Sequence, residues 1–139
     1  MNGAKVYTNK ALNKIIFKGD KDGCVTSVVL ENGYEIKADL VVIGAGIDLN
    51  TELAIECGLK MDENGGVCLN PLLQTSDNNI FAAGDIASFP SWSAGKNIRI
   101  EHWITAQDQG TYAAFNMLGK MTPYGNIPFF WTNQYGKGI

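Results

Sequence analysis

The sequence feature that most constrains the fold is the apolar run 80–83, which ends at Gly84 and is followed by Asp85. Such a run is typical of a short strand, and a glycine at its end lets the backbone turn without a side-chain clash. The carboxylate would then lie at the carboxyl edge of the strand, where open α/β sheets bind ligands. Asp85 is therefore a candidate to accept a hydrogen bond from a sugar-like hydroxyl group. The alternative for this tripeptide alone is a turn in which Asp85 caps a helix.

The length and composition of the chain indicate one ordinary folded domain. Its 139 residues suffice for a hydrophobic core, and 45% apolar against 18% charged residues argue against disorder. The net charge of −3 leaves no basic face to neutralise phosphates, so we expect no nucleic-acid binding by this segment. No apolar run approaches the roughly 20 residues that span a bilayer, and the N-terminus does not resemble a signal peptide. We therefore expect an intracellular chain without a membrane segment, in the cytoplasm or in mitochondria.

The three cysteines, Cys24, Cys57 and Cys68, have no Cys-x-x-Cys spacing, so we expect neither a redox dithiol nor a zinc site. They are predicted to be small buried hydrophobic side chains of an intracellular protein. The single histidine, His102, argues against a typical zinc site, and no serine or cysteine nucleophile stands with it in a recognisable context.

The first third of the sequence has the pattern of an antiparallel meander. Short apolar runs alternate there with turns, and these runs are 5–7, 12–17, 25–30 and 34–36. The turn sequences at 20–23 and 31–33 are strong hairpin signals. The next run, 39–44, is apolar after its first residue, which is typical of a strand buried on both faces in a parallel sheet.

A short helix and a short strand are predicted next. Asn50 or Thr51 can cap a helix over residues 52–57, and Gly58 would end it. Residues 67–69 follow a glycine-rich turn and have the pattern of a short strand.

One long helix is the strongest prediction in the second half of the chain. It runs over residues 103–118, between a surface loop predicted at 86–98 and a linker at 123–128 that is rich in proline and glycine. Small side chains recur on one face and would let the helix sit close against a sheet. This predicted stripe consists of Ala106, Gly110, Ala113, Ala114 and Met117.

A Gly-x-Gly sequence at Gly44 and Gly46 follows the predicted strand at 39–44. A dinucleotide-binding fingerprint would have a third glycine where Leu49 stands, and a side chain there would hold helix and strand apart. We interpret the segment as a crossover at a strand end, where Gly46 allows close approach of a ligand or of a neighbouring strand.

Glu101, His102 and Trp103 stand together at the start of the long helix, where free N–H groups and the helix dipole favour an acceptor atom. The alternative is a surface acid, a solvent-facing histidine and a core indole. Trp131 follows two phenylalanines and has two interpretations as well. The sequence alone favours a core aromatic cluster, and the alternative is a flat wall against a planar ring.

Taken in order, these segments resemble the FAD-dependent pyridine nucleotide oxidoreductases, in particular the branch of ferredoxin reductases and apoptosis-inducing-factor-like proteins. The matching segments are 41–53, 75–85, 101–106 and 128–134. The resemblance implies an α/β fragment of a flavoprotein with two dinucleotide-binding domains, containing an antiparallel meander, a few parallel strands and one long helix. The implied parts are the end of the NAD(P)-binding domain (1–49), the returning segment of the FAD-binding domain (50–122) and the start of a C-terminal interface domain (123–139).

The resemblance also implies roles for single residues near the flavin. Asp85, which follows Gly84, matches the aspartate that binds the ribityl chain of FAD. His102 and Trp103 match contacts near the flavin, and Glu101 and His102 match residues on the nicotinamide side of the flavin ring.

Two further residues are implied to lie near the nicotinamide cofactor. Gly46 would contact NAD where the chain leaves the NAD domain, and Trp131 would lie beside the flavin and the nicotinamide. Leu49 departs from the family pattern, which usually has proline before Asn50. The glycine loops of the family for FAD and NAD pyrophosphates are not among these residues, so the resemblance predicts a fragment of a longer enzyme.

The implied activity is hydride transfer from NAD(P)H to FAD and electron transfer onward to a ferredoxin or Rieske centre, or to a quinone. The fragment alone is expected to be inactive. The alternative is an inactive α/β binding or interaction module that retains the motifs. Because strands ending at Gly44 and Gly84 would lack sheet neighbours, a homodimer of the isolated chain is also predicted.

Overall fold

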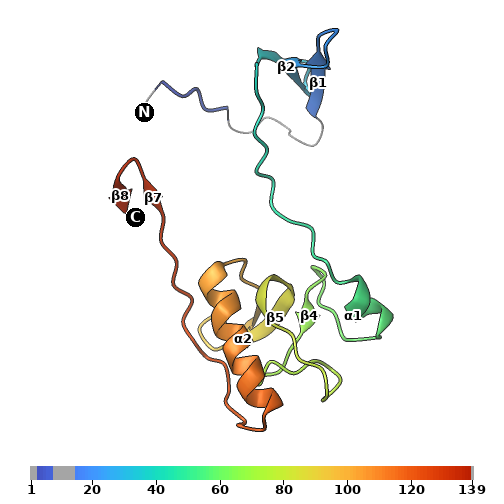
Figure 1. The fold of residues 1–139 in the computed structure, drawn as a ribbon, viewed down its shortest axis with the longest axis vertical. Helices are drawn as coiled ribbons and strands as arrows, with labels where there is room; N and C mark the ends of the chain where they lie inside the picture. Colours follow the sequence, from blue (N-terminus) through green and yellow to red (C-terminus); the bar gives the residue numbers. More distant parts are fainter. Residues whose placement is uncertain (1–2, 8–14, 139) are drawn as a thin grey trace. The chain divides into compact units, whose positions relative to one another are not determined.

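The computed structural model describes residues 3–7 and 15–138. The chain divides into two compact units, Met1–Gly46 and Ile47–Ile139. Figure 1 shows β1 and β2 in the first unit, and α1, β4, β5 and α2 in the second.

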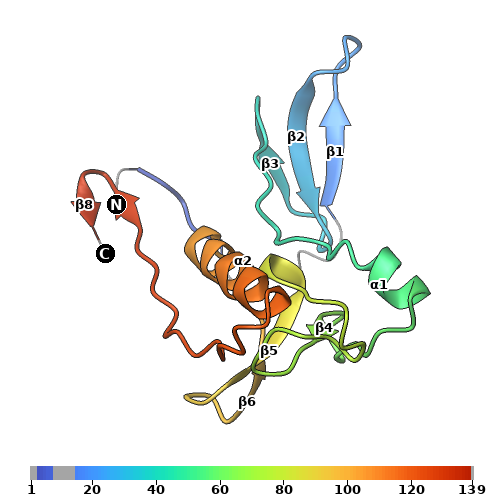
Figure 2. The ribbon, with the colours of Figure 1, turned by 60° about the horizontal axis from the view of Figure 1, so that its bottom comes forward.

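The first unit is the predicted antiparallel meander. Its strands β1 (Ile15–Gly19), β2 (Val25–Leu30) and β3 (Glu35–Lys37) pair in the order β1-β2-β3 and lie side by side in Figure 2. Phe17 pairs with Val28 across the first hairpin, and both hairpins are antiparallel. The apolar run 5–7 forms no strand, and residues 12–14 lie outside the described residues.

The strand predicted at residues 39–44 is not formed. Leu40 and Val42 are 79% and 87% exposed, and none of the described strands pairs with this segment. A strand of this kind is stabilised by a hydrogen-bonded neighbour on each side and by burial of both faces. Neither condition is met among the described residues, so the apolar pattern alone does not produce a strand.

The predicted short helix and strand are both present in the second unit. Helix α1 (Glu52–Glu56) begins after Thr51, whose side chain makes no capping hydrogen bond. Gly58 ends the turn with a positive φ of 68°, the conformation in which glycine commonly terminates helices. Strand β4 (Val67–Cys68) follows.

The surface loop predicted over residues 86–98 is wrong, because it contains two strands. Strands β5 (Ala87–Ser91) and β6 (Lys96–Ile98) form a hairpin, and β5 pairs in parallel with β4. Strand β5 is central and mostly buried, with Phe89 only 3% exposed. Burial on both faces removes the alternation that marks a strand in sequence, and the serines of β5 obscure its apolar character.

The long helix is confirmed as α2 (Trp103–Met117), but its packing face overlaps the predicted one only at buried Ala113 and half-buried Ala106. The residues of α2 that are buried are Thr105, Gln109, Ala113 and Asn116. Gly110, Ala114 and Met117 of the predicted stripe are exposed. The Asn116 side chain explains the difference, because it donates to the carbonyl oxygens of Leu72 and Thr122 and accepts from the Thr122 N–H. Such polar contacts to loop backbone select the face that packs.

The core of the second unit lies between β4, β5, α2 and the segment that follows α2. Tyr124 is buried, although it belongs to the predicted linker, and it makes edge-to-face contacts at 5.3 Å with Phe89 and with Tyr112. Residues 120–132 form neither helix nor strand, and a small hairpin of β7 (Asn133–Gln134) and β8 (Lys137–Gly138) follows. Part of the linker is therefore a structural component of the core.

The cysteine prediction is wrong for two of the three residues. Cys24 and Cys57 are exposed, Cys68 is half-buried, and all three are free thiols. No helix within residues 3–7 and 15–138 is long and apolar enough to cross a membrane.

Candidate functional site

Residues 80–83, predicted as a strand, are extended but join no sheet. Phe81 forms an isolated bridge with Gln74, and the Ala82 N–H donates to the Leu73 carbonyl oxygen at 3.2 Å. The segment then enters a short 3-10 helix, η1 (Gly84–Ile86). The predicted change of direction at Gly84 is correct, whereas the strand before it is reduced to one bridge.

Gly84 is held directly against helix α2. Its φ of 82° lies in the region that favours glycine, and a β-carbon there would lie 3.6 Å from the Ala106 β-carbon. Its N–H donates to the Gln109 Oε1 at 2.8 Å. The long helix therefore fixes the turn that carries Asp85.

Asp85 and Glu101 are connected through a residue that the sequence analysis did not identify. The Arg99 Nη1 donates to the Asp85 carbonyl oxygen at 3.1 Å and to the Glu101 Oε1 at 2.8 Å. The Asp85 side chain is exposed, and no described residue donates a hydrogen bond to its carboxylate. Arg99 is the only arginine in the sequence and stands two residues before Glu101, which was the available signal.

The guanidinium of Arg99 also lies near Asp62. Burial opposes ionisation of this carboxyl group, but the Ser88 hydroxyl, the backbone N–H groups of Gly66 and Asn64 and the charge of Arg99 outweigh that effect and lower the pKa of Asp62. Both N–H groups donate to the Asp62 Oδ1 at 2.8 Å. Asp62, Arg99 and Glu101 thus form a small charged network, and the hydroxyl of Ser88 connects it to β5.

His102 is the N-cap of α2. Its Nδ1 accepts a hydrogen bond from the Ile104 N–H at 3.3 Å, which requires that Nδ1 carry no proton. The ring lies 5.8 Å from that of Phe130, centroid to centroid. The structure therefore brings the aromatic segment 129–131 to the start of the helix.

The two tryptophans of the candidate site are not core residues. Trp103 is 76% exposed and Trp131 is 63% exposed, so the core interpretation of both is wrong in this chain. Large exposed indoles beside a helix N-terminus leave flat apolar surface available to a planar group. Gly46, at the end of the first unit, has a φ of 90° and open space where a β-carbon would stand.

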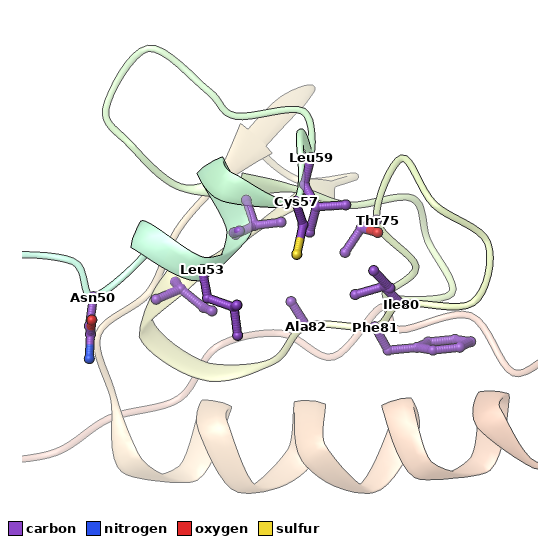
Figure 3. A pocket seen from close by; sticks show the side chains of 11 residues that line it. Asn50, Leu53, Cys57, Leu59, Thr75, Ile80, Phe81 and Ala82 are labelled. Carbon is purple, nitrogen blue, oxygen red and sulfur yellow. The ribbon is translucent and has the colours of Figure 1, made fainter.

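A separate cavity of about 250 Å³ lies between α1 and residues 75–86 (Figure 3). Figure 3 shows mostly apolar side chains pointing into it, together with the thiol of Cys57. The lining residues are Asn50, Leu53, Ala54, Cys57, Leu59, Val67, Thr75, Ile80, Phe81, Ala82 and Ile86. The cavity contains no cationic side chain, so it is not suited to a nucleotide phosphate.

The residues around Gly84 and the start of α2 fit a flavin nucleotide. Asp85 offers a free carboxylate to hydroxyl groups, and the first turn of α2, apart from the capped Ile104 N–H, offers N–H groups to acceptor oxygens. The Gln109 Nε2 is buried without a hydrogen-bond partner, which leaves one more donor beside the turn. FAD has hydroxyl groups on its ribityl chain and acceptor oxygens on its ring, which matches this set of donors and acceptors.

The fold and this site define a part of a two-dinucleotide-binding flavoprotein reductase. Residues 1–110 match the family described as pyridine nucleotide-disulphide oxidoreductase, and the chain belongs to that family. Its members are FAD-dependent NAD(P)H oxidoreductases, and the relatives include ferredoxin reductases and apoptosis-inducing-factor-like proteins.

Two curated relatives illustrate the similarity. Human apoptosis-inducing factor 3 is 33% identical over 139 residues, which cover 99% of this chain and 22% of the relative. Putidaredoxin reductase from Pseudomonas putida is 39% identical over 115 residues, which cover 83% of this chain and 27% of the relative. The chain thus spans about a quarter of the length of these relatives.

Solved structures agree with the sequence comparisons. A ferredoxin reductase from Rhodopseudomonas palustris matches with a TM-score of 0.76 and 37% identity, covering 86% of this chain and 29% of that one. The covalent complex of putidaredoxin reductase with putidaredoxin matches with a TM-score of 0.77 and 39% identity, covering 88% and 29%. The predicted fold class is confirmed.

Proposed function

We propose that this chain is part of a flavin-dependent oxidoreductase that transfers a hydride from NAD(P)H to FAD and passes electrons to an iron-sulfur protein or a similar acceptor. The geometry of the turn at Gly84 is the main support for the proposal. The turn at Gly84 is fixed against α2 by the Gln109 hydrogen bond, and it presents the unpartnered carboxylate of Asp85. A rigid turn with a free carboxylate is prepared to bind a hydroxyl-bearing ligand.

In this proposal, the residues of the site divide the binding of FAD between them. The Asp85 carboxylate accepts from a ribityl hydroxyl group, and the N–H groups in the first turn of α2 that His102 does not cap donate to acceptor oxygens of the flavin. Arg99 keeps the backbone of Asp85 and the side chain of Glu101 in place through its two hydrogen bonds. When bound, FAD supplies the ring that accepts the hydride and releases electrons to the next carrier.

The nicotinamide side is assigned to Glu101, His102 and Trp131. The His102 Nδ1 is engaged by the helix backbone, so only Nε2 is available to a cofactor. The exposed indole of Trp131 offers a flat face to a planar ring and would exclude water from it. Gly46, in the first unit, is proposed to contact NAD.

Three parts of the domain organisation are proposed together with these roles. Residues 1–49 would end the NAD(P)-binding domain, 50–122 would return to the FAD-binding domain, and 123–139 would begin a C-terminal interface domain. The division of the chain after Gly46 supports the first of these boundaries.

The proposed electron acceptor is a protein of the ferredoxin type. The support comes from the relatives, which include ferredoxin–NAD(+) reductase components of dioxygenase systems and putidaredoxin reductase, solved in covalent complex with putidaredoxin. A Rieske centre or a quinone is compatible with the same flavin chemistry.

Anaerobic titration of the full-length protein with NADH tests the proposal. We expect a yellow protein whose flavin absorbance is bleached by NADH and restored by an oxidised ferredoxin. The variant Asp85→Ala should lose flavin, whereas Glu63→Gln, at another exposed acid of the same unit, should retain it. A colourless full-length protein that is inert to NADH would contradict the proposal and favour an inactive binding module.

A further inference from the structure

We infer that Gln109 is a positioning residue for the proposed FAD site, because its side-chain amide fixes the turn that presents Asp85. The inference rests on the proposed function and adds a residue that does not itself carry the binding carboxylate. Gln109 lies in the middle of α2, 25 residues from Gly84 along the sequence. No motif in the sequence marks Gln109 as a functional residue.

The hydrogen bond between Gln109 and Gly84 is short, and the Gln109 side chain is buried. The Gln109 Oε1 accepts the Gly84 N–H at 2.8 Å, and the Gln109 side chain is among the most buried in the second unit, at 1% exposure. A backbone N–H can bond only to the oxygen of the amide, so this bond also fixes which way the amide points. Removing the acceptor would leave a partly buried N–H unsatisfied, which costs more than the net worth of the bond.

The bond acts at the residue where the chain changes conformation. Ala83 is extended, with φ −149° and ψ 160°, while Gly84 has a φ of 82° and begins η1. Ala106 lies three residues before Gln109, on the same side of the helix, and packs against Gly84. A contact and a hydrogen bond from one helix face therefore fix the direction in which the next residue, Asp85, leaves the turn.

The other half of the amide, the Gln109 Nε2, has no partner among the described residues. The Gln109 Nε2 is the one buried side-chain nitrogen or oxygen atom in the described part of the chain that has no hydrogen-bond partner. Buried amide donors in native proteins are normally satisfied by protein, water or ligand atoms. In the FAD-bound protein, an oxygen atom of the nucleotide or of a water molecule that it orders would satisfy this donor.

A neighbouring residue shows what a purely structural amide looks like on the same helix. Asn116 is also buried, and both of its amide atoms are satisfied by the backbone of Leu72 and Thr122. Its contacts are with the loops and not with the turn at Gly84. Asn116 is therefore the matched control for a loss of stability without a loss of positioning, and exposed Gln107 is the control for substitution on α2 as such.

The test measures FAD affinity and the flavin midpoint potential of the full-length protein for Gln109→Leu, Gln109→Glu, Asn116→Ala and Gln107→Leu. We expect Gln109→Leu to raise the FAD dissociation constant roughly tenfold to a hundredfold, because the variant loses the bond to Gly84 and leaves the Gly84 N–H without an acceptor. It should also shift the flavin potential. Asn116→Ala should lower the melting temperature yet keep FAD affinity and potential within about twofold of wild type, and Gln107→Leu should change neither.

The glutamate variant separates positioning from packing. At low pH the protonated carboxyl group of Gln109→Glu keeps an oxygen that accepts the Gly84 N–H and an O–H that replaces the Nε2 donor. Ionisation at higher pH removes this donor and places a charge in a buried site. We expect near-normal FAD affinity for Gln109→Glu at low pH and a fall at higher pH that wild type does not show. If Gln109→Leu does not fold, the FAD affinity of Gln109→Glu at low pH decides the question.

Three outcomes are distinguishable. Wild-type FAD affinity and potential in Gln109→Leu, or weak FAD binding by Gln109→Glu at low pH, where the acceptor and a donor are both kept, would overturn the inference while the proposed function stands. Equal losses of FAD affinity in Gln109→Leu and Asn116→Ala would also overturn it. A wild-type protein without flavin would remove the proposed function, and amide exchange at Gly84 in Gln109→Leu would still decide whether Gln109 fixes the turn.

Discussion

The guanidinium of Arg99 lies 2.8 Å from the carboxylate of Glu101, and the same nitrogen bonds to the Asp85 backbone. Two candidate cofactor ligands from separate elements are thereby held by one side chain. The pair is partly shielded from solvent, with side-chain exposures of 23% and 41%. This relationship makes Arg99 the most informative residue of the site for mutagenesis.

Replacing Arg99 with methionine should lower the free energy of unfolding by about 1 kcal/mol, because a partly shielded pair and a bond to a backbone carbonyl are lost together. Flavin affinity should fall as well, since the backbone of Asp85 loses one support. Thermal unfolding and FAD titration measure the two effects. Lys18→Met, which breaks the exposed pair with Glu35 in the first unit, is the control and should change neither.

Gly66 has no room for a side chain. A β-carbon there would lie 2.9 Å from the Asp62 Oδ2, 3.2 Å from the Ser88 β-carbon and 3.3 Å from the Arg99 Cδ. We expect Gly66→Ala to destabilise the protein by about 1–3 kcal/mol, as overpacked sites do. Gly110→Ala is the opposite control, because open space surrounds this exposed helical glycine and alanine should stabilise by about 0.5–1 kcal/mol. Denaturant unfolding that ranks the two variants equally would contradict this account of Gly66.

Asp62 gives the fold a pH dependence in the acid range. Its pKa in the folded protein lies below the ordinary value of 3.8, so its contribution is fully present above that value and is lost as pH falls through the lower, folded pKa. The stability difference between wild type and Asp62→Asn should therefore be constant near neutral pH and shrink below pH of about 4. Urea unfolding of both proteins across this range measures it, and a difference that grows on acidification would contradict the assignment.

His102 has two roles that substitution can separate. His102→Ala should lower the free energy of unfolding by about 0.5–2 kcal/mol because it removes the N-cap, whereas His102→Asn should preserve the cap. Both variants remove the imidazole from the nicotinamide side and should weaken NADH reduction of the flavin alike. Equal stability of the two variants would show that the cap is not used, and normal reduction in both would remove His102 from the site.

Much of the fold could be predicted from the sequence where a pattern is local. The helical periodicity from Trp103 onward predicts α2, and the turn sequences of the first unit predict the meander. Gly84 and Asp85 were recognisable because an apolar run ends at a glycine and a carboxylate follows it, and the φ of 82° at Gly84 is a conformation that favours glycine.

The rest depended on contacts between residues far apart in sequence. Strand β5 pairs with two neighbours and is buried on both faces, so it has no alternation to detect. Gln109 was missed because its partner, Gly84, is 25 residues away. The strand expected at 39–44 does not form, because an apolar run becomes a strand only when other strands pair with it.

Asp85, on the turn held by α2, is proposed to bind FAD through its carboxylate. The most direct measurement is the FAD dissociation constant of the full-length apoprotein for wild type, Asp85→Ala and the control Glu63→Gln. We expect Asp85→Ala to weaken FAD binding roughly tenfold or more, because it removes a hydrogen bond to a charged acceptor, while Glu63→Gln binds like wild type. Wild-type affinity in Asp85→Ala would contradict this role of Asp85.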